Sequence, residues 1–290
     1  MLSGEFSVAL SQRLPDRQLK KPGFKRFEMD LGLDGKRALI TGSSSGIGAA
    51  IARKLAAEGC QIIVHGRDKA RAEEVGNEVG AVAIAIGDLS TDEAADRVRE
   101  IAGDIDILVN NAGGSAASAS MPWLDVDEVR WADTYQMNVI SAVRMIRRFL
   151  PTMLAQGWGR IINVASAGGM QPTLTGPNYV AAKGAMLNIT SSLAKSLGDS
   201  GVTVNSVSPG LTFTPSVASW MERLRQQDGW RGLTDKEMEK RMATELMAIP
   251  IGRFGQPEDI AHAVCMVSSV HAGFMLGSNV RVDGGFVLGV

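Results

Sequence analysis

Short apolar runs alternate with longer amphipathic segments along most of the chain. Each run spans a few residues without the polar alternation of a half-exposed strand, so it predicts a strand buried on both faces. Seven such runs lie at residues 37–40, 62–64, 82–86, 105–109, 161–164, 202–207 and 280–282. Helical spacing of apolar positions predicts helices near residues 49–58, 69–79, 91–102, 126–156, 178–198 and 257–269.

This alternation of strands and helices predicts a parallel sheet with helices on both faces. Crossovers between parallel strands are right-handed, so the expected fold class is α/β, a doubly wound sheet of seven strands. No linker interrupts residues 29–290, and no repeat of solenoid period occurs there. We therefore expect one domain over residues 29–290.

Residues 1–28 differ from the rest of the chain. They carry six Lys or Arg against three Asp or Glu and show no hydrophobic period. We expect a disordered extension, an expression remnant or an upstream mis-started reading frame. A transit peptide is the alternative, but Glu5 and Asp16 are unusual in a leader of that kind.

Residues 215–255 break the alternation, because they contain no strand signal and are rich in Trp and Met. We expect one or two helices inserted before the last helix. Their apolar side chains fit two interpretations equally, a satellite core or an apolar lid over a substrate, since flexible Met suits both. The apolar positions are Trp220, Met221, Leu224, Trp230, Met238, Met242, Leu246 and Met247.

Composition narrows the function classes. The chain is 45% hydrophobic and 21% charged with a net charge of -1, so it offers no basic field for nucleic acid. No apolar run reaches the ~18 residues of a membrane span. Cys60 and Cys265 lie in apolar contexts, which favours free buried thiols. We expect a soluble cytoplasmic protein.

A glycine-rich turn follows the first predicted strand and opens a helix. Gly42, Gly46 and Gly48 have the spacing Gly-x-x-x-Gly-x-Gly. Glycine lets the backbone approach a pyrophosphate closely, and a helix N-terminus offers unpaired N–H groups to the phosphates. The turn therefore predicts a dinucleotide site; an ordinary glycine-rich loop is the alternative.

Tyr179 and Lys183 lie one helical turn apart on a predicted helix. A free tyrosine has a pKa of ~10, and a neighbouring ammonium favours the phenolate and lowers that pKa. Tyr179 is thus a candidate acid/base for a carbonyl or hydroxyl oxygen. The histidines at 65, 262 and 271 have no partners at metal-ligand spacing, so we expect no metal site.

With these motifs the sequence resembles the short-chain dehydrogenase/reductases, a family with a Rossmann fold. The likeness rests on Thr41–Gly48 and on five further matches in order, namely Asp88–Leu89, Asn110–Gly113, the set Asn138, Ser166, Tyr179 and Lys183, Pro209–Gly210, and Thr212 with Thr214. It covers about residues 33–285. The resemblance implies a cofactor site made of Gly42, Ser44, Ser45, Gly46, Ile47, Gly48, Arg67, Asp88, Leu89, Asn110, Ala112, Gly113, Tyr179, Lys183, Pro209, Gly210, Thr212 and Thr214.

The resemblance also implies roles for the catalytic set. Tyr179 would be the acid/base, and Lys183 would hold the nicotinamide ribose hydroxyls. Ser166 would hydrogen-bond the reacting oxygen. Asn138 would bend its helix and hold a water that links Lys183 to solvent.

The end of the second strand bears on the choice of cofactor. An acid that binds the adenosine ribose would fall at Gly66, which cannot repel a 2′-phosphate. Arg67 follows and can pair with that phosphate, although Asp68 stands next to it. We expect a preference for NADP(H), with NAD(H) as the alternative and Arg67 as a solvated loop charge in that case.

The sequence is most similar to bacterial reductases grouped with 3-oxoacyl-carrier-protein reductases, through residues 250–259 and 282–285. We expect an oxidoreductase that interconverts a small-molecule ketone and a secondary alcohol. The alternatives are a dinucleotide-sensing or scaffold protein without turnover, and an epimerase or dehydratase built on the same site. The long 215–255 segment favours a bulkier or more apolar substrate. The resemblance further implies a homotetramer that pairs subunits through residues 126–156 and 178–198, with a second interface at the last strand.

Overall fold

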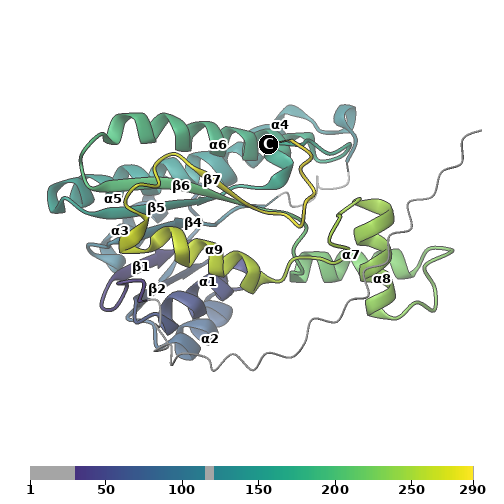
Figure 1. Ribbon diagram of the computed structural model, residues 1–290, viewed down its shortest axis with the longest axis horizontal. Coiled ribbons are helices and arrows are strands. Elements are labelled where there is room, and N and C mark those ends of the chain that lie inside the picture. Colours follow the sequence, from purple (N-terminus) through teal and green to yellow (C-terminus); the bar gives the residue numbers. More distant parts are fainter. Residues whose placement is uncertain (1–29, 115–120, 290) are drawn as a thin grey trace, which may run out of the picture. The chain divides into compact units, whose positions relative to one another are not determined.

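A computed structural model of the chain describes residues 30–114 and 121–289. Its centre is one parallel sheet of seven strands in the order β3-β2-β1-β4-β5-β6-β7 (Figure 1). The strands are β1 (Arg37–Ile40), β2 (Gln61–Gly66), β3 (Ala83–Ile86), β4 (Ile107–Asn110), β5 (Gly159–Val164), β6 (Val202–Pro209) and β7 (Asn279–Val282). The predicted doubly wound α/β fold is confirmed, with strand ends that differ from the predicted ones by a few residues.

Helices cover both faces of the sheet. One face carries α1 (Gly46–Ala57), α2 (Lys69–Val79) and α9 (Pro257–Ser268), which pack in a single buried cluster with the strands. The other carries α3 (Asp92–Ala102), α5 (Ser141–Gln156) and α6 (Pro177–Leu197), which form a second cluster around Phe149. The central strands are fully buried because both faces are covered, which explains their uninterrupted apolar sequences.

The long helix predicted over residues 126–156 is interrupted. It consists of α4 (Glu128–Tyr135), a π-helical turn (Gln136–Ile140) and α5, and is preceded by a 3₁₀ turn at Trp123–Asp125. Side chains around the turn bind the carbonyls four residues back: Asn138 Nδ2 donates to Thr134, and Ser141 Oγ donates to Met137. Such bonds compete with the regular helical pattern and bend helices, and π turns occur frequently at functional sites.

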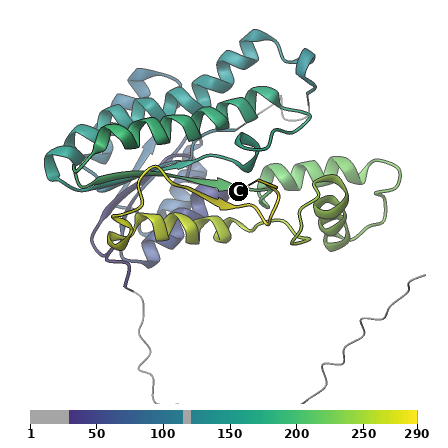
Figure 2. The same ribbon diagram turned by 45° about the horizontal axis from the view of Figure 1, so that its top comes forward.

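Residues 215–255, called the cap below, form α7 (Pro215–Arg225), α8 (Asp235–Arg241) and a π-helical turn (Met242–Leu246), as expected. Figure 2 shows α7 and α8 beyond the end of the sheet. The cap has its own core, so the satellite-core interpretation holds for most of its apolar residues. Trp220 and Met247 are only partly buried, and Leu246 is 50% exposed. The buried members are Val217, Met221, Leu224, Trp230, Met238, Met242, Ala243, Ile249 and Phe254.

Residues Leu31–Val290 form one compact unit. The expectation of a disordered extension over residues 1–28 lies outside the described residues. Within the described part of the chain, no helix is long and apolar enough to cross a bilayer.

Candidate active site

The glycine-rich turn between β1 and α1 is closed by backbone contacts that exclude side chains. Gly42 has φ +66, and a Cβ there would lie 2.9 Å from the Ala112 Cα. A Cβ on Gly48 would lie 2.3 Å from the Gly42 carbonyl oxygen. Gly46 has φ +54, in the left-handed region that favours glycine. The turn therefore requires glycine at all three positions.

The turn leaves the first N–H groups of α1 available to an anion. Ser45 is the N-cap residue and its side chain makes no capping hydrogen bond. The loop after β4 holds the turn in place, because Asn111 Nδ2 donates to the carbonyls of Thr41 and Gly42 at 3.0 Å each. Unpaired N–H groups at a helix N-terminus are the arrangement that binds phosphates.

His65, on β2, is a residue of this site that sequence reasoning missed. It is 2% exposed, its Nδ1 accepts a hydrogen bond from the Gly42 N–H at 3.1 Å, and its Nε2 lies 3.2 Å from the Gly87 carbonyl. The two contacts require the neutral ring with the proton on Nε2. Burial lowers the pKa of His65 to about 4, so the ring stays neutral at physiological pH. A lone histidine in a strand gave no signal of this role.

β2 ends at Gly66, so no acidic side chain stands at the position expected to bind the adenosine ribose. A Cβ on Gly66 would lie 2.8 Å from the Ser44 hydroxyl oxygen, so a larger residue there would displace Ser44. Arg67 is exposed and forms a loose ion pair with Asp88 at 3.9 Å. The pKa of Asp88 is lowered, first by the Ser90 backbone N–H that its carboxylate accepts and to a lesser degree by Arg67.

These groups line one pocket at the carboxyl ends of β1, β2, β3 and β4. The strand order reverses between β1 and β4, and open parallel sheets bind ligands at such a point. The glycine turn, the helix N-terminus and the polar rim fit a dinucleotide. The pocket is lined by Gly42, Ser44, Ser45, His65, Gly66, Arg67, Gly87, Asp88, Leu89, Ser90, Ala112, Gly113, Met137 and Ser141.

Other predicted cofactor residues lie around this pocket. Thr214, at the start of α7, contacts the glycine turn, since a Cβ on Gly46 would lie 3.5 Å from its Cγ2. Gly210 passes so close to Asp283 that a Cβ would lie 2.7 Å from its Cα, and Thr212 Oγ1 donates to the Gly210 carbonyl. Asn110 is different: its Nδ2 donates to Asn163 Oδ1 in the core.

The candidate catalytic side chains of this group come from the turn after β5, which carries Ser166, and from α6, which carries Tyr179 and Lys183. Ser166 Oγ accepts a hydrogen bond from the Gly168 N–H, which fixes the 3₁₀ turn Ala167–Gly169. Its hydroxyl also acts on Tyr179, where it lowers the pKa of the phenol against the larger effect of burial. The Lys183 ammonium donates to the Val164 carbonyl at 2.9 Å and lies 5.7 Å from the centre of the Tyr179 ring. The structure thus brings Ser166, Tyr179 and Lys183 together.

Gly169 and Gly184, which sequence reasoning did not single out, permit this close approach of the Ser166 loop to α6. A Cβ on Gly169 would lie 2.7 Å from the Lys183 carbonyl carbon and 2.8 Å from the Gly184 nitrogen. The loop that carries Ser166 therefore rests directly on the backbone of α6. Glycines in loops and helices are common, so only the three-dimensional contact reveals them.

Asn138 holds the loop after β4 in place. It is 1% exposed, its Oδ1 accepts from the Gly114 N–H at 3.0 Å, and its Nδ2 donates to the Gly114 carbonyl at 2.8 Å. A Cβ on Gly113 would lie 2.4 Å from Asn138 Oδ1. The bend expected at Asn138 is present as the π-helical turn, and the side chain holds the loop after β4.

The model of the family described as short chain dehydrogenase matches residues 36–225. The chain is 40% identical over 266 residues to the oxidoreductase YvrD of Bacillus subtilis, covering 89% of this chain and 99% of that protein. It is 34% identical over 266 residues to the 3-oxoacyl-[acyl-carrier-protein] reductase FabG of Aquifex aeolicus, with the same coverage of 89% and 99%. The chain belongs to the short-chain dehydrogenase family.

Among solved structures, the chain is similar to the L-sorbose reductase of Gluconobacter frateurii in complex with NADPH and L-sorbose. The TM-score is 0.81 at 33% identity, covering 90% of this chain and 100% of that one. The predicted family resemblance is confirmed, and with it the prediction of an NAD(P)-dependent dehydrogenase or reductase.

One expectation about this short-chain dehydrogenase needs correction. The Lys183 ammonium was expected to lower the pKa of Tyr179, but burial raises it, and only the hydrogen bond with Ser166 acts in the opposite direction. Burial also lowers the pKa of Lys183 to about 8. The ammonium donates its hydrogen bond to the Val164 carbonyl rather than to the phenol.

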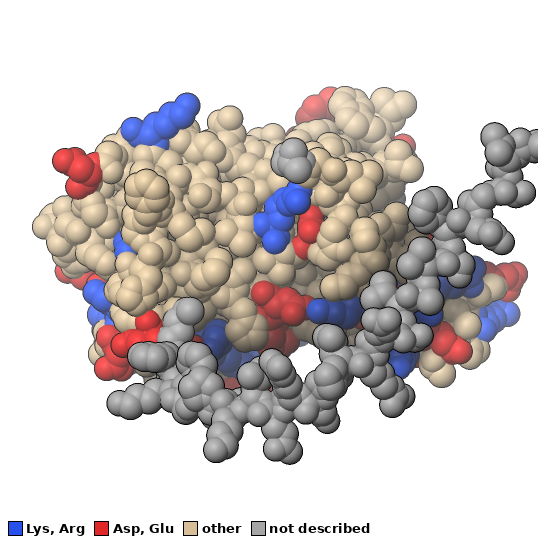
Figure 3. All heavy atoms as spheres, in the orientation of Figure 1, with Lys and Arg blue, Asp and Glu red and all other residues tan. Residues whose placement is uncertain are grey.

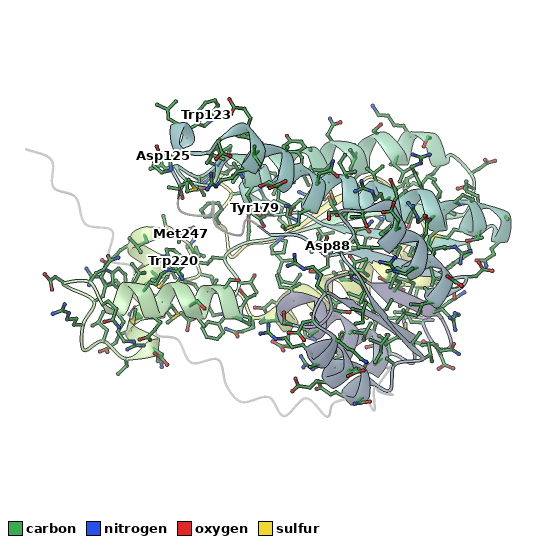
Figure 4. The ribbon with its side chains drawn as sticks, turned by 180° about the vertical axis from the view of Figure 1, so that it is seen from behind. Asp88, Trp123, Asp125, Tyr179, Trp220 and Met247 are labelled. Carbon is green, nitrogen blue, oxygen red and sulfur yellow. The ribbon has the colours of Figure 1, made fainter. Side chains whose placement is uncertain are left out.

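Aromatic and apolar side chains from two segments lie on the same side of the molecule as Tyr179. Figure 4 shows Tyr179 between Trp123 and Asp125 of the 3₁₀ turn on one side and Trp220 and Met247 of the cap on the other. Trp123 is 63% exposed and packs against Trp131 with ring centres 6.0 Å apart. Among the described residues, no group of three or more His, Cys, Asp or Glu is placed to hold a metal.

Proposed function

We propose that this protein interconverts a ketone and a secondary alcohol with NADP(H), using Tyr179 as the general acid/base. The observation that carries the proposal is the convergence of three side chains: the Ser166 hydroxyl acts on the pKa of Tyr179, and the Lys183 ammonium lies 5.7 Å from the centre of the Tyr179 ring. Two hydroxyl groups that converge from different elements can bind the same carbonyl oxygen. Mere dinucleotide binding does not require this arrangement.

In the reducing direction, the Tyr179 hydroxyl donates its proton to the carbonyl oxygen while Ser166 donates a hydrogen bond to that oxygen. When bound, the nicotinamide supplies the hydride. Lys183, by family resemblance, holds the nicotinamide ribose, and the Val164 carbonyl orients its ammonium. Asn138 keeps the loop after β4 in place through Gly114. In the oxidising direction Tyr179 removes the proton from the alcohol.

The test replaces Tyr179 with Phe, which keeps the ring and removes the hydroxyl. We expect loss of turnover with unchanged NADPH affinity, measured by absorbance of the reduced nicotinamide and by its fluorescence on titration. The chain has two tyrosines, so Tyr135→Phe is the matched control. Near-normal turnover of Tyr179→Phe would refute the assignment.

The preference for NADP(H) is supported by the residues at the end of β2. Gly66 carries no negative charge, and Ser44 and Arg67 line the pocket beside it. Arg67 is paired with Asp88 only at 3.9 Å, so its guanidinium is free to turn toward a 2′-phosphate. The NADPH complex of the L-sorbose reductase supports the same choice.

Arg67→Ala should weaken NADPH binding about 10- to 100-fold and leave NADH binding unchanged, because a charge-assisted contact to a phosphate is worth ~1.5–3 kcal/mol. Arg71→Ala is the control, since Arg71 pairs with Asp68 on α2 and does not line the pocket. Both affinities are measured by fluorescence titration. Tighter NADH than NADPH binding by the unaltered protein would overturn the cofactor assignment.

The apolar side chains on the side of the molecule that carries Tyr179 support a neutral, largely apolar carbonyl substrate. Trp220 and Met247 are partly buried members of the cap core, and Figure 4 shows them on the same side of the sheet as Tyr179 and Trp123. Asp125 adds a negative charge beside Trp123, which disfavours anionic substrates. A panel of ketones of graded size and charge, assayed with NADPH, should give the highest kcat/KM for neutral apolar compounds.

We also propose a cytoplasmic homotetramer. Both cysteines are free and buried, which is consistent with a reducing compartment. The face that carries α6 and β7 has few charged side chains (Figure 3). Phe274, which precedes β7, is fully exposed at 104%, and Leu276 is 38% exposed. Such apolar exposure is typical of an interface between subunits.

A further inference from the structure

The first turn of α6, which carries Tyr179, is tied to α4 by the residue before the tyrosine. Asn178 is 0% exposed, and its Nδ2 donates to Thr134 Oγ1 at 2.7 Å and to the Arg130 carbonyl at 3.3 Å. Thr134 is itself 7% exposed. Hydrogen bonds between buried polar groups are costly to remove, because the partner is left unsatisfied.

Thr134 continues this connection toward the other candidate catalytic groups. Its Oγ1 donates to the Arg130 carbonyl at 2.7 Å, and its own carbonyl accepts from Asn138 Nδ2 at 2.9 Å. Asn138 in turn binds both backbone groups of Gly114. A continuous chain of buried and partly buried hydrogen bonds therefore joins α6, the π-helical turn and the loop after β4.

The first turn of α6 is not held by a side-chain cap of its own. Its N-cap is Gly176 in the left-handed region at φ +64, and no side chain caps the helix. Pro177 follows and donates no backbone hydrogen bond. The Gly176 N–H donates to the Met121 carbonyl, outside the first turn. Among the described residues, the Asn178 side chain supplies the hydrogen bonds from this turn to α4.

We propose that Asn178 is a positioning residue for Tyr179. Through its hydrogen bond to Thr134, it fixes the position of the phenol relative to Ser166 and to the π-helical turn that carries Asn138. The proposal rests on the proposed role of Tyr179 as acid/base. A positioning role and a purely structural role of Asn178 predict different effects of its replacement. Loss of a structural hydrogen bond lowers stability alone, whereas misplacement of the phenol lowers the rate of the chemical step.

The experiment compares Asn178→Ala and Thr134→Val with a matched control, Asn205→Ala. Asn205 is likewise buried, at 1% exposed, and its amide also makes two hydrogen bonds, to Met275 and Ser278, but these lie beside β6 and β7. All three variants are assayed for melting temperature, NADPH affinity, kcat and KM. Thr134→Val keeps the side-chain shape, so it remains informative if Asn178→Ala fails to fold.

We expect Asn178→Ala and Thr134→Val to lower kcat about 10- to 100-fold with unchanged NADPH affinity, because small misplacements of a reacting group cost that much. The pH dependence of kcat should shift in both variants. Asn205→Ala should lower the melting temperature and leave kcat and its pH dependence unchanged. The double variant should lose little more than either single one, since both remove the same bond.

The proposal is overturned if Asn178→Ala and Thr134→Val keep the kcat and pH profile of Asn205→Ala. Tyr179→Phe separates this failure from failure of the proposed function. If Tyr179→Phe retains turnover, the acid/base assignment itself is wrong. If Tyr179→Phe is inactive while the two positioning variants are fully active, only the role of Asn178 fails.

Discussion

Lys183 is 4% exposed, and burial of its ammonium should measurably lower the free energy of unfolding of the protein. Burial lowers its pKa from 10.5 to about 8, a fall of roughly 2.5 pH units. At about 1.4 kcal/mol per unit, the ammonium form destabilises the folded state by about 3 kcal/mol at pH 7. Replacing Lys183 with Met removes that cost and leaves the Val164 carbonyl unsatisfied, a loss of about 1–2 kcal/mol. The net expectation is a more stable but inactive protein.

The gain should be about 1–2 kcal/mol at pH 7, or roughly 2–3 °C in melting temperature for a chain of this size. It should shrink as pH rises. Between pH 8 and 10.5 the folded protein loses the Lys183 proton while the unfolded chain still holds it, so the unaltered protein gains stability relative to the variant. From pH 7 to pH 9.5 this recovery amounts to about 2 kcal/mol.

Thermal and urea unfolding at several pH values measure both effects. Lys195→Met is the matched control, because Lys195 is exposed on the same helix. It should change stability by less than about 0.5 kcal/mol, with no pH dependence in that window. The reasoning is refuted if Lys183→Met is no more stable than the unaltered protein at pH 7, or if their difference does not vary between pH 7 and pH 9.5.

Three further outcomes are expected. Gly169→Ala should force the Ser166 loop away from α6 and lower kcat about 100-fold in the ketone reduction assay, with NADPH binding retained; normal kcat would contradict the close contact. Phe274→Asp should lower the assembly state measured by light scattering, because it places a charge in the proposed interface, and an unchanged mass would exclude this residue from it. Because the pKa of Tyr179 is raised, alcohol oxidation should increase with pH through the alkaline range, whereas ketone reduction should not; parallel pH profiles in the two directions would argue against Tyr179 as the titrating group.

The fold followed from the sequence because each strand is an uninterrupted apolar run between helical segments. What the pattern missed was the break at Gln136–Ile140, since a π-helical turn has no hydrophobic period of its own. The signal was local and polar: Thr134, Asn138 and Ser141 recur at spacings where their side chains reach the carbonyls four residues back. Helix amphipathicity is insensitive to such bonds.

Site residues could be predicted from the sequence where the chemistry requires a particular residue type at a fixed spacing. They could not be predicted where a residue acts only by contact with residues distant in the sequence. The glycine turn and the Tyr179–Lys183 pair have fixed spacings, so they are visible in one dimension. His65 and Gly169 act through neighbours distant in sequence, at Gly42, Gly87 and α6.

The same distinction explains the wrong expectation for the pKa of Tyr179. Sequence spacing placed a cation near the phenol, but the sign of the shift depends on where the ammonium points and how much water reaches the ring. Lys183 is directed at the Val164 carbonyl, and burial dominates at Tyr179. The raised pKa favours the protonated phenol, the form that the proposed role of Tyr179 as proton donor in reduction requires. In the proposed mechanism, the positive charge of a bound oxidised nicotinamide would lower the pKa of the phenol, so that binding of the oxidised cofactor would favour proton removal by Tyr179.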